Sequence, residues 1–237
     1  MKILGLDSSG LVASVAVAEE ENLLAEYTVN YKKTHSQTLL PMLDEIVKMI
    51  ELDLNSIDAI AVAGGPGSFT GLRIGSATAK GLGFALGKPL IQIPTVDGLA
   101  YNLWGTQELV CPLMDARRNQ TYTGLYAFER GEMQVITPQC AVGIAEIISK
   151  INEMNRAIVF LGDGVTVFRP FIQEHCKVPF SFAPAHLNKQ RAGAVAVLGC
   201  LYYQQGKIQP AAQHRPDYLR LSQAERERLA QEKALSK

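Results

Sequence analysis

The sequence has no excess of charge of either sign, because 23 Lys and Arg residues are balanced by 23 Asp and Glu residues. A chain with this balance has no overall attraction for nucleic acid, so any RNA it meets is expected to be held mainly by a partner. No stretch reaches the roughly 18 apolar residues of a membrane-spanning helix. The apolar run at residues 3–6 ends at Asp7 and is too short for a signal peptide. We therefore expect a cytoplasmic protein with no membrane contact.

Cysteine and histidine are scarce and scattered. The four cysteines include no C-x-x-C pair, so they are expected to be small apolar core residues in a reducing compartment. The four histidines, His35, His175, His186 and His214, form no i, i+4 metal pair. Ser68 lies in G-P-G-S-F rather than in the G-x-S-x-G elbow of a serine nucleophile. The residues therefore predict no catalytic set, no metal site and no cofactor.

Glycine, by contrast, is concentrated: eight of the 20 glycines fall between positions 64 and 87. Residues 57–63 are apolar enough for a buried strand, residues 64–69 form a glycine–proline loop, and a helix is expected from about Thr70. Four glycines lie in this helix, and each costs it roughly 1 kcal/mol relative to alanine. Close packing would compensate, since small residues recur every four positions on two faces. These faces are Gly75, Ala79 and Gly83, and Ala77, Gly81 and Ala85. We predict that one face packs inside its own lobe and that the other receives a second protein.

The same segment also resembles a phosphate-binding loop, in which backbone N–H groups cradle the anion. Its spacing over residues 65–71 is G-x-G-x-x-x-G, one residue longer than the dinucleotide fingerprint, and no Gly-Lys-Ser/Thr follows. Pro66 also removes one N–H donor. Gly65, Gly67 and Ser68 are therefore candidates only for a weak phosphate contact.

The order of the expected elements divides the chain into two similar halves. Each half has the order β-β-β-α-β-α, which is the plan of the α/β, actin-like (ASKHA, sugar-kinase-like) two-lobe fold. The expected lobes are residues 1–105 and 106–189, with a helix over 190–206 packing back on the first. The expected strands are 3–9, 12–19, 24–31, 57–63, 90–93, 109–115, 122–129, 133–137 and 157–161, and the other helices are 36–50, 70–86, 95–104, 143–154 and 165–175.

Two of these helices carry terminal signals. Ser36 is the expected cap of the first helix, with Pro41 near its first turn and an apolar stripe that begins at Leu39. From residue 210 the chain becomes a charged tail, in which a capping box opens a helix over 225–234.

Two turns would face each other across the cleft of an actin-like fold, where ATPases bind phosphate. The first turn, DSSG at 7–10, has the expected composition. The second begins with Asp115, but Arg117 and Arg118 stand where glycines would admit phosphate. These arginines contact a phosphate or RNA, or they form an exposed polar hairpin turn, which is the commoner case. The alternative function is thus an ATPase or small-molecule kinase that uses both turns and loop 65–68. The candidate contacts in the two turns are Asp7, Ser8, Ser9 and Asp115.

Four segments resemble the TsaB (YeaZ) family, in the expected order from one end of the chain to the other. The most specific is AVAGGPGSFTGLRIG at 61–75, and the others are ILGLDSS at 3–9, THSQTLLP at 34–41 and PDYLR at 216–220. The resemblance implies that the chain is a non-catalytic relative of TsaD. TsaD is the catalytic subunit that forms threonylcarbamoyladenosine on tRNA next to the anticodon. TsaD proteins carry an H-x-x-x-H metal pair after the strand that follows the glycine-rich helix, and residues 93–101 contain no histidine.

The resemblance also implies how the chain assembles. TsaB proteins dock onto TsaD, or onto a second copy of themselves, through the first helix and the glycine-rich helix. TsaE, a P-loop ATPase, joins at the junction, and tRNA is reached only through the complex. The interface residues that the resemblance and the helix pattern indicate are His35, Leu39, Met42, Leu43, Thr70, Arg73, Ala77, Lys80, Gly81 and Phe84.

Overall fold

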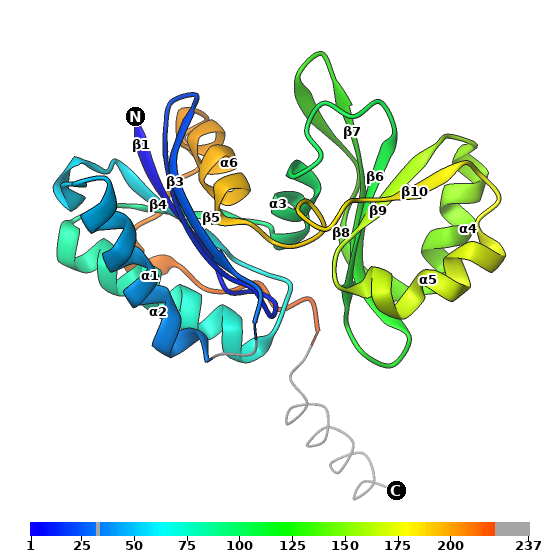
Figure 1. Ribbon diagram of the computed structural model, residues 1–237, viewed down its shortest axis with the longest axis horizontal. Helices are drawn as coiled ribbons and strands as arrows, with labels where there is room; N and C mark the ends of the chain where they lie inside the picture. The colour runs from blue at the N-terminus through cyan, green and yellow to red at the C-terminus, as the bar shows by residue number, and fades with distance from the viewer. Residues whose placement is uncertain (32–33, 221–237) are drawn as a thin grey trace, which may run out of the picture.

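The two halves of the chain form two five-stranded sheets with the same strand order. The computed structural model describes residues 1–31 and 34–220, and Figure 1 shows the sheets side by side. The first sheet has the order β3-β2-β1-β4-β5 and the second the order β8-β7-β6-β9-β10. In both, the first three strands are antiparallel, and the last two run parallel to the central one. This repeated order confirms the predicted duplicated, actin-like two-lobe fold. The strands are β1 (Lys2–Asp7), β2 (Ala13–Glu19), β3 (Asn22–Val29), β4 (Ala59–Ala63), β5 (Leu90–Ile93), β6 (Leu109–Asp115), β7 (Gln120–Glu129), β8 (Glu132–Gly143), β9 (Ile158–Leu161) and β10 (Phe180–Phe182).

Two strands of the second sheet differ from the sequence prediction. β8 extends well beyond the predicted 133–137, because it pairs with β7 along nearly its whole length across register shifts near Leu125. β10 is absent from the prediction, since its three residues are too few to give a periodicity signal. It nevertheless completes the sheet by pairing with β9.

Helices cover both faces of each sheet. The outer face of the first sheet carries α1 (His35–Met49) and α2 (Phe69–Leu86), and the outer face of the second carries α4 (Ile144–Met154) and α5 (Gly164–His175) (Figure 1). The inner faces carry α6 (Ala192–Gln204) and α3 (Thr95–Tyr101). Two short 3-10 turns, η1 (Leu54–Ser56) and η2 (Ala211–Gln213), lie on the first lobe. Among the described residues, no helix combines the length and apolarity that crossing a membrane would require.

The two inner helices are exchanged between the halves. α3 follows the last strand of the first sheet, yet Val96 and Leu99 pack in a cluster with residues of the second sheet. α6 follows the last strand of the second sheet and packs on the first. It approaches closely, since a Cβ on Gly5 would lie 2.5 Å from the Ala192 carbonyl oxygen. Each sheet therefore needs a helix from the other half to cover its inner face. The predicted boundary at residue 105 assigns residues 95–104 to the first lobe, whereas α3 packs on the second sheet.

The starts of α1 and α2 differ from expectation by one or two residues. α1 begins at His35, and its N-cap is Thr34, which makes no side-chain capping bond. Ser36 is therefore inside the helix rather than its cap, and Pro41 lies in the second turn. α2 begins at Phe69, and Ser68 caps it by accepting a bond from the Gly71 N–H. The predicted helix over 225–234 lies outside the described residues.

Candidate functional site

The inner face of α2 packs against the turn between β1 and β2. A Cβ added to Gly71 would lie 2.0 Å from the Ser8 carbonyl oxygen, and one added to Gly75 would lie 2.5 Å from Ser8 Oγ. Ser8 Oγ also donates to the Gly71 carbonyl oxygen at 2.9 Å. Gly83 is likewise buried, and a Cβ added to it would lie 3.1 Å from a side-chain carbon of Leu90. The glycines on this face therefore have a structural reason, which is the close approach of the helix to its own sheet and turn.

The outer face of α2 is open. Its exposed residues include the large side chain of Phe84, 64% exposed, and a Cβ added to Gly81 would meet nothing within 4 Å. Lys80 is half-buried because its ammonium group donates to the carbonyl oxygens of Ala212 and His214. Nothing in the described part of the chain packs against Gly81, so no contact there offsets the loss of helix stability that a glycine causes. We call this surface the docking face; its exposed members are Thr70, Arg73, Ala77, Gly81 and Phe84.

Three of the α1 residues expected at an interface lie on the buried side of that helix. Leu39, Met42 and Leu43 are at most 4% exposed and pack into the core of the first lobe. They cannot contact a partner directly, because the stripe that marks a helix's apolar face is the one that covers its own sheet. The exposed apolar residues of α1 are instead Leu40 at 52% and Met49 at 80%. Both Leu40 and Met42 lie outside the stripe expected from the sequence, yet only Leu40 is exposed, because Met42 packs into the core.

His35, the first residue of α1, ties this helix to the first turn. It is half-buried, and its Nε2 lies 2.8 Å from the Gly10 carbonyl oxygen. The side chain thus holds the start of α1 against residues 7–10. We interpret His35 as a residue that positions α1.

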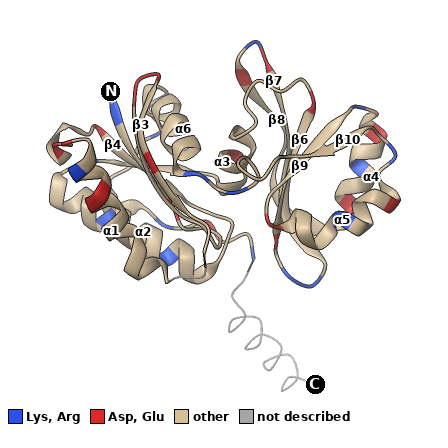
Figure 2. Cartoon of the chain, viewed as in Figure 1, with Lys and Arg blue, Asp and Glu red and all other residues tan. Residues whose placement is uncertain are grey.

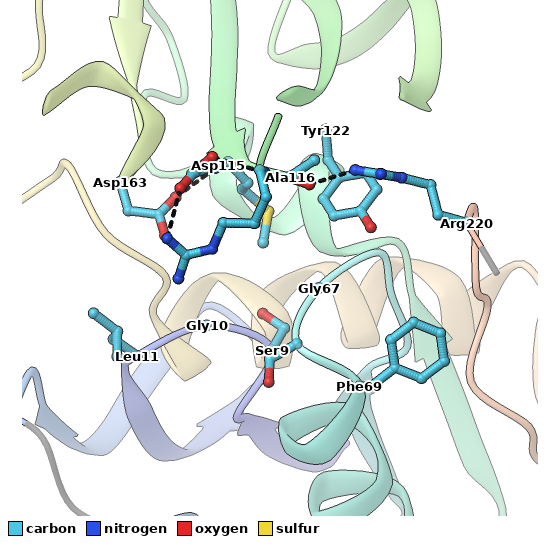
Figure 3. Close-up of a pocket in the computed structure, with 13 residues that line it drawn as sticks. Ser9, Gly10, Leu11, Gly67, Phe69, Asp115, Ala116, Tyr122, Asp163 and Arg220 are labelled. Atoms are coloured by element: carbon cyan, nitrogen blue, oxygen red, sulfur yellow. Dashed lines mark hydrogen bonds and ion pairs between the residues drawn. The ribbon is translucent and has the colours of Figure 1, made fainter. Parts of the chain in front are cut away.

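A cavity of about 390 Å³ lies between the lobes, where the two turns meet (Figure 3). From the first lobe it is lined by Ser9, Gly67 and Ser68, three of the residues for which a weak phosphate contact is expected. Arg220 lines it as well, and nothing in the local sequence around that residue indicated this. The full lining is Ser9, Gly10, Leu11, Gly67, Ser68, Phe69, Met114, Asp115, Ala116, Arg117, Tyr122, Asp163 and Arg220.

Three predicted contacts point away from this cavity. Asp7 is buried behind the turn, where its Oδ1 accepts bonds from Ser9 N at 2.8 Å and Ser9 Oγ at 2.7 Å. Burial raises the pKa of the Asp7 carboxyl to about 6, against the lowering effect of those two bonds. Ser8 faces α2, and a Cβ on Gly65 would lie 2.1 Å from the Asp217 carbonyl oxygen. Asp7, Ser8 and Gly65 therefore shape the turns and do not line the cavity.

The second turn has an unusual backbone. Arg117, Arg118 and Asn119 have φ values of 64°, 57° and 56°, so three consecutive non-glycine residues are left-handed, each at a cost of about 1–3 kcal/mol. Asp115 accepts a bond from Arg117 N at 2.8 Å and pairs with the Arg117 guanidinium at 3.3 Å. It is thus engaged by the arginine that stands where a phosphate loop would carry glycine.

Neither turn presents a cluster of metal ligands. Asp163 Oδ1 accepts a bond from Asp115 N at 3.2 Å, and burial raises the pKa of Asp163. Within residues 1–31 and 34–220, no group of three His, Cys, Asp or Glu side chains is placed to hold a metal ion. Arg117 and Arg118 are exposed, and Figure 2 shows blue and red positions interspersed over both lobes in this view. The charged residues that line the cavity are of both signs, namely Asp115 and Asp163 on one hand and Arg117 and Arg220 on the other.

Comparison with known proteins identifies relatives along most of the chain. The family model for TsaD, tRNA N6-adenosine threonylcarbamoyltransferase, matches residues 22–228. The tRNA threonylcarbamoyladenosine biosynthesis protein TsaB of Bacillus subtilis (strain 168) is 32% identical over 228 residues, which are 95% of this chain and 96% of that protein. The protein of the same name from Escherichia coli (strain K12) is 26% identical over 223 residues, covering 93% and 95%. The structure of YeaZ from Pseudomonas aeruginosa superposes with a TM-score of 0.77 at 26% identity, covering 92% of this chain and all of that one.

Proposed function

The chain belongs to the TsaB (YeaZ) family, and from this premise we propose that it is a non-catalytic subunit of the machinery that forms threonylcarbamoyladenosine on tRNA. In this proposal it docks onto the catalytic subunit TsaD through the docking face of α2 and the exposed side of α1. The observation that carries the proposal is Gly81, a glycine in the middle of a long helix with open space beside it.

The cost of this glycine is the reason to expect a partner. A glycine in an exposed helix interior destabilises the helix by roughly 1 kcal/mol relative to alanine. Gly71 and Gly75 are required by the closeness of Ser8, but no described residue requires Gly81. A second helix crossing at Ala77 and Gly81 could approach the α2 backbone closely, with Arg73 and Phe84 at the two ends of the contact. Arginine and aromatic side chains are the types that dominate binding energy at protein interfaces.

The surroundings of Asp97 support a non-catalytic role. The segment 93–101, where TsaD proteins are expected to carry their histidine pair, contains α3. Asp97 on this helix is buried, and its Oδ1 accepts a bond from the Tyr126 hydroxyl at 2.7 Å. Burial also raises the pKa of this carboxyl. The acid thus joins α3 to the second sheet, which is a structural task, and the transfer reaction is assigned to TsaD.

The test compares two leucine substitutions on helices of different lobes. Gly81→Leu places a branched side chain on the docking face, whereas Thr166→Leu places one on an exposed position of α5. Light scattering of the wild-type chain mixed with TsaD should give the mass of a heterodimer, and calorimetry its affinity. Gly81→Leu should weaken this affinity by about a hundredfold, the loss of roughly 2.7 kcal/mol that one blocked hot spot can cause. Thr166→Leu should leave it unchanged.

Two results would count against docking at α2. One is a wild-type chain that forms no complex with TsaD under any nucleotide condition. The other is equal affinity for the wild type and Gly81→Leu. If the isolated chain forms a homodimer through the same face, the leucine should disrupt that homodimer as well. TsaE is proposed to join at the junction of the two subunits, and tRNA to be reached only through the complex.

The interlobe cavity supports one alternative, a small-molecule kinase or ATPase of the actin-like fold. Ser9, Gly67, Ser68 and Asp115 are the predicted contacts that line it. If the isolated chain hydrolyses ATP, phosphate release should exceed that of a boiled control, and Asp7→Asn should abolish this release because it removes the ionisable carboxyl behind the Ser9 turn. If the wild type releases no more phosphate than the boiled control, this alternative is wrong.

A further inference from the structure

Residues 216–220, which we call the strap, cross from one lobe to the other. On the first lobe, Asp217 N donates to the Gly64 carbonyl oxygen at 2.6 Å. The Tyr218 ring stacks on Phe69, with centroids 4.5 Å apart and planes within 3° of parallel. Arg73 Nε donates to Tyr218 Oη at 3.3 Å. The strap is thus anchored to the glycine loop and to the first turn of α2.

The same five residues also hold the second lobe. Arg220 donates from Nη1 to the carbonyl oxygen of Ala116, at the start of the strained turn, as Figure 3 shows at the edge of the cavity. Gln139 Nε2 donates to Asp217 Oδ2 at 3.4 Å, and Leu219 packs against the apolar cluster that contains Met114. Each of the two lobes therefore holds the strap by several contacts, and a change in the angle between the lobes must break one set of them.

The strap also meets the docking face. Arg73 belongs to that face, and its guanidinium carbon lies 5.8 Å and 6.0 Å from the ring centroids of Phe69 and Tyr218. Tyr218 is 38% exposed, although its ring is stacked. Arg73 and Ala77 are four residues apart on α2 and so lie on the same side of it. The exposed surface is therefore continuous from Gly81 through Arg73 to Tyr218.

We propose that the strap and the docking face form one binding surface, and that the partner bound there holds the interlobe cavity closed. This inference rests on the proposed function, so the occupant is the fold-related subunit TsaD, and a second copy of this chain is an outcome of the test. The partner contacts Arg73 and Tyr218 and so fixes the strap, and the strap in turn fixes Arg220 against Ala116. By thermodynamic reciprocity, a ligand that closes the cavity strengthens docking by the same factor.

Hydrogen–deuterium exchange of the wild-type chain, with and without TsaD, tests this link. Two amides of the second turn are hydrogen-bonded and can report on it, namely Ala116 N to Gln120 O and Gln120 N to Arg117 O. Partner binding should slow their exchange about tenfold, which corresponds to a coupling of about 1.4 kcal/mol. If TsaD protects α2 but not these amides, the link is wrong and the proposed function stands. If it protects neither, the proposed function fails as well. Protection in the absence of TsaD that rises with protein concentration would mean that a second copy is the occupant, and would overturn the choice of TsaD.

A pair of arginine substitutions separates the strap's role from simple folding. Arg220→Ala removes the anchor on Ala116 without touching the docking face. Arg215→Ala removes an exposed arginine five residues earlier, for which no bond is present among the described residues. Arg220→Ala should weaken the affinity for TsaD about tenfold and abolish protection of the second turn, while α2 remains protected. Arg215→Ala should behave as wild type. Equal affinities for wild type and Arg220→Ala, with unchanged melting temperatures, would overturn the proposal.

Discussion

Replacing Gly81 by alanine should make the isolated protein more stable, although the residue lies on the surface proposed to bind a partner. The added Cβ meets nothing within 4 Å, and Gly81 is not among the residues with positive φ. The substitution therefore gains helix propensity and reduces the entropy of the unfolded chain without creating a clash. Together these effects raise the free energy of unfolding by about 0.5–1 kcal/mol. For a chain of this length the melting temperature should rise by about 1–4 °C.

Gly71 in the same helix provides the matched comparison. A Cβ there would lie 2.0 Å from the Ser8 carbonyl oxygen, a backbone atom that can move away only if the turn between β1 and β2 shifts. Gly71→Ala should lower the free energy of unfolding by about 1–3 kcal/mol, the usual cost of overpacking. Urea denaturation followed by circular dichroism measures both variants. If Gly81→Ala were as destabilising as Gly71→Ala, Gly81 would be required by the chain's own packing, and it would no longer indicate a surface that binds a partner.

Two buried acids give further predictions. Burial raises the Asp7 pKa from 3.8 to about 6, so its stabilising contribution is full below about pH 4 and is lost as pH rises through about 6. The wild-type free energy of unfolding should therefore fall by roughly 3 kcal/mol over this window. Asp7→Asn keeps an acceptor for both Ser9 bonds but does not titrate, so this fall should be absent. Identical pH profiles for the two proteins in urea titrations would contradict this. Tyr126→Phe takes away the hydroxyl that donates to Asp97, and should lower the unfolding free energy by about 1–3 kcal/mol because a buried carboxyl loses a donor. An unchanged denaturation midpoint would show that the bond contributes little.

Local patterns in the sequence were sufficient to predict the order of elements. The apolar composition of β4 and β9 and the 3.6-residue periodicity of α4 are properties of short segments, and these elements lie within two residues of the predicted ranges. The exchange of α3 and α6 could not be predicted in this way. Periodicity indicates that a helix has a buried face, but it does not indicate which sheet covers that face. Both sheets present apolar inner faces, and only the three-dimensional path of the chain decides between them.

The candidate site was predicted in part, for a related reason. The glycine spacing in α2 indicated two close-packing faces, and the structure shows one against Ser8 and one open. On α1 the pattern indicated the apolar stripe at Leu39 and Leu43, but a stripe that covers the core is not free to bind anything else. The side available to a partner is the one opposite, which includes Leu40. A resemblance to a family can indicate which helix to expect at an interface, whereas burial is needed to indicate which of its faces is free.

Under the proposed docking, the two kinds of glycine in α2 together account for how the contact could be transmitted across the molecule. Gly71 and Gly75 let the helix backbone rest directly against Ser8, with no flexible side chain between them to absorb a displacement. Protein interiors packed this closely transmit strain. A partner that presses on the outer face at Gly81 therefore does not move α2 relative to β1. The element that can still respond is the strap, because its stack on Phe69 lies at the exposed end of the helix and its far end reaches the second lobe. Under the proposed docking, rigid seating of α2 on its inner side leaves the angle between the lobes as a degree of freedom that the partner can change.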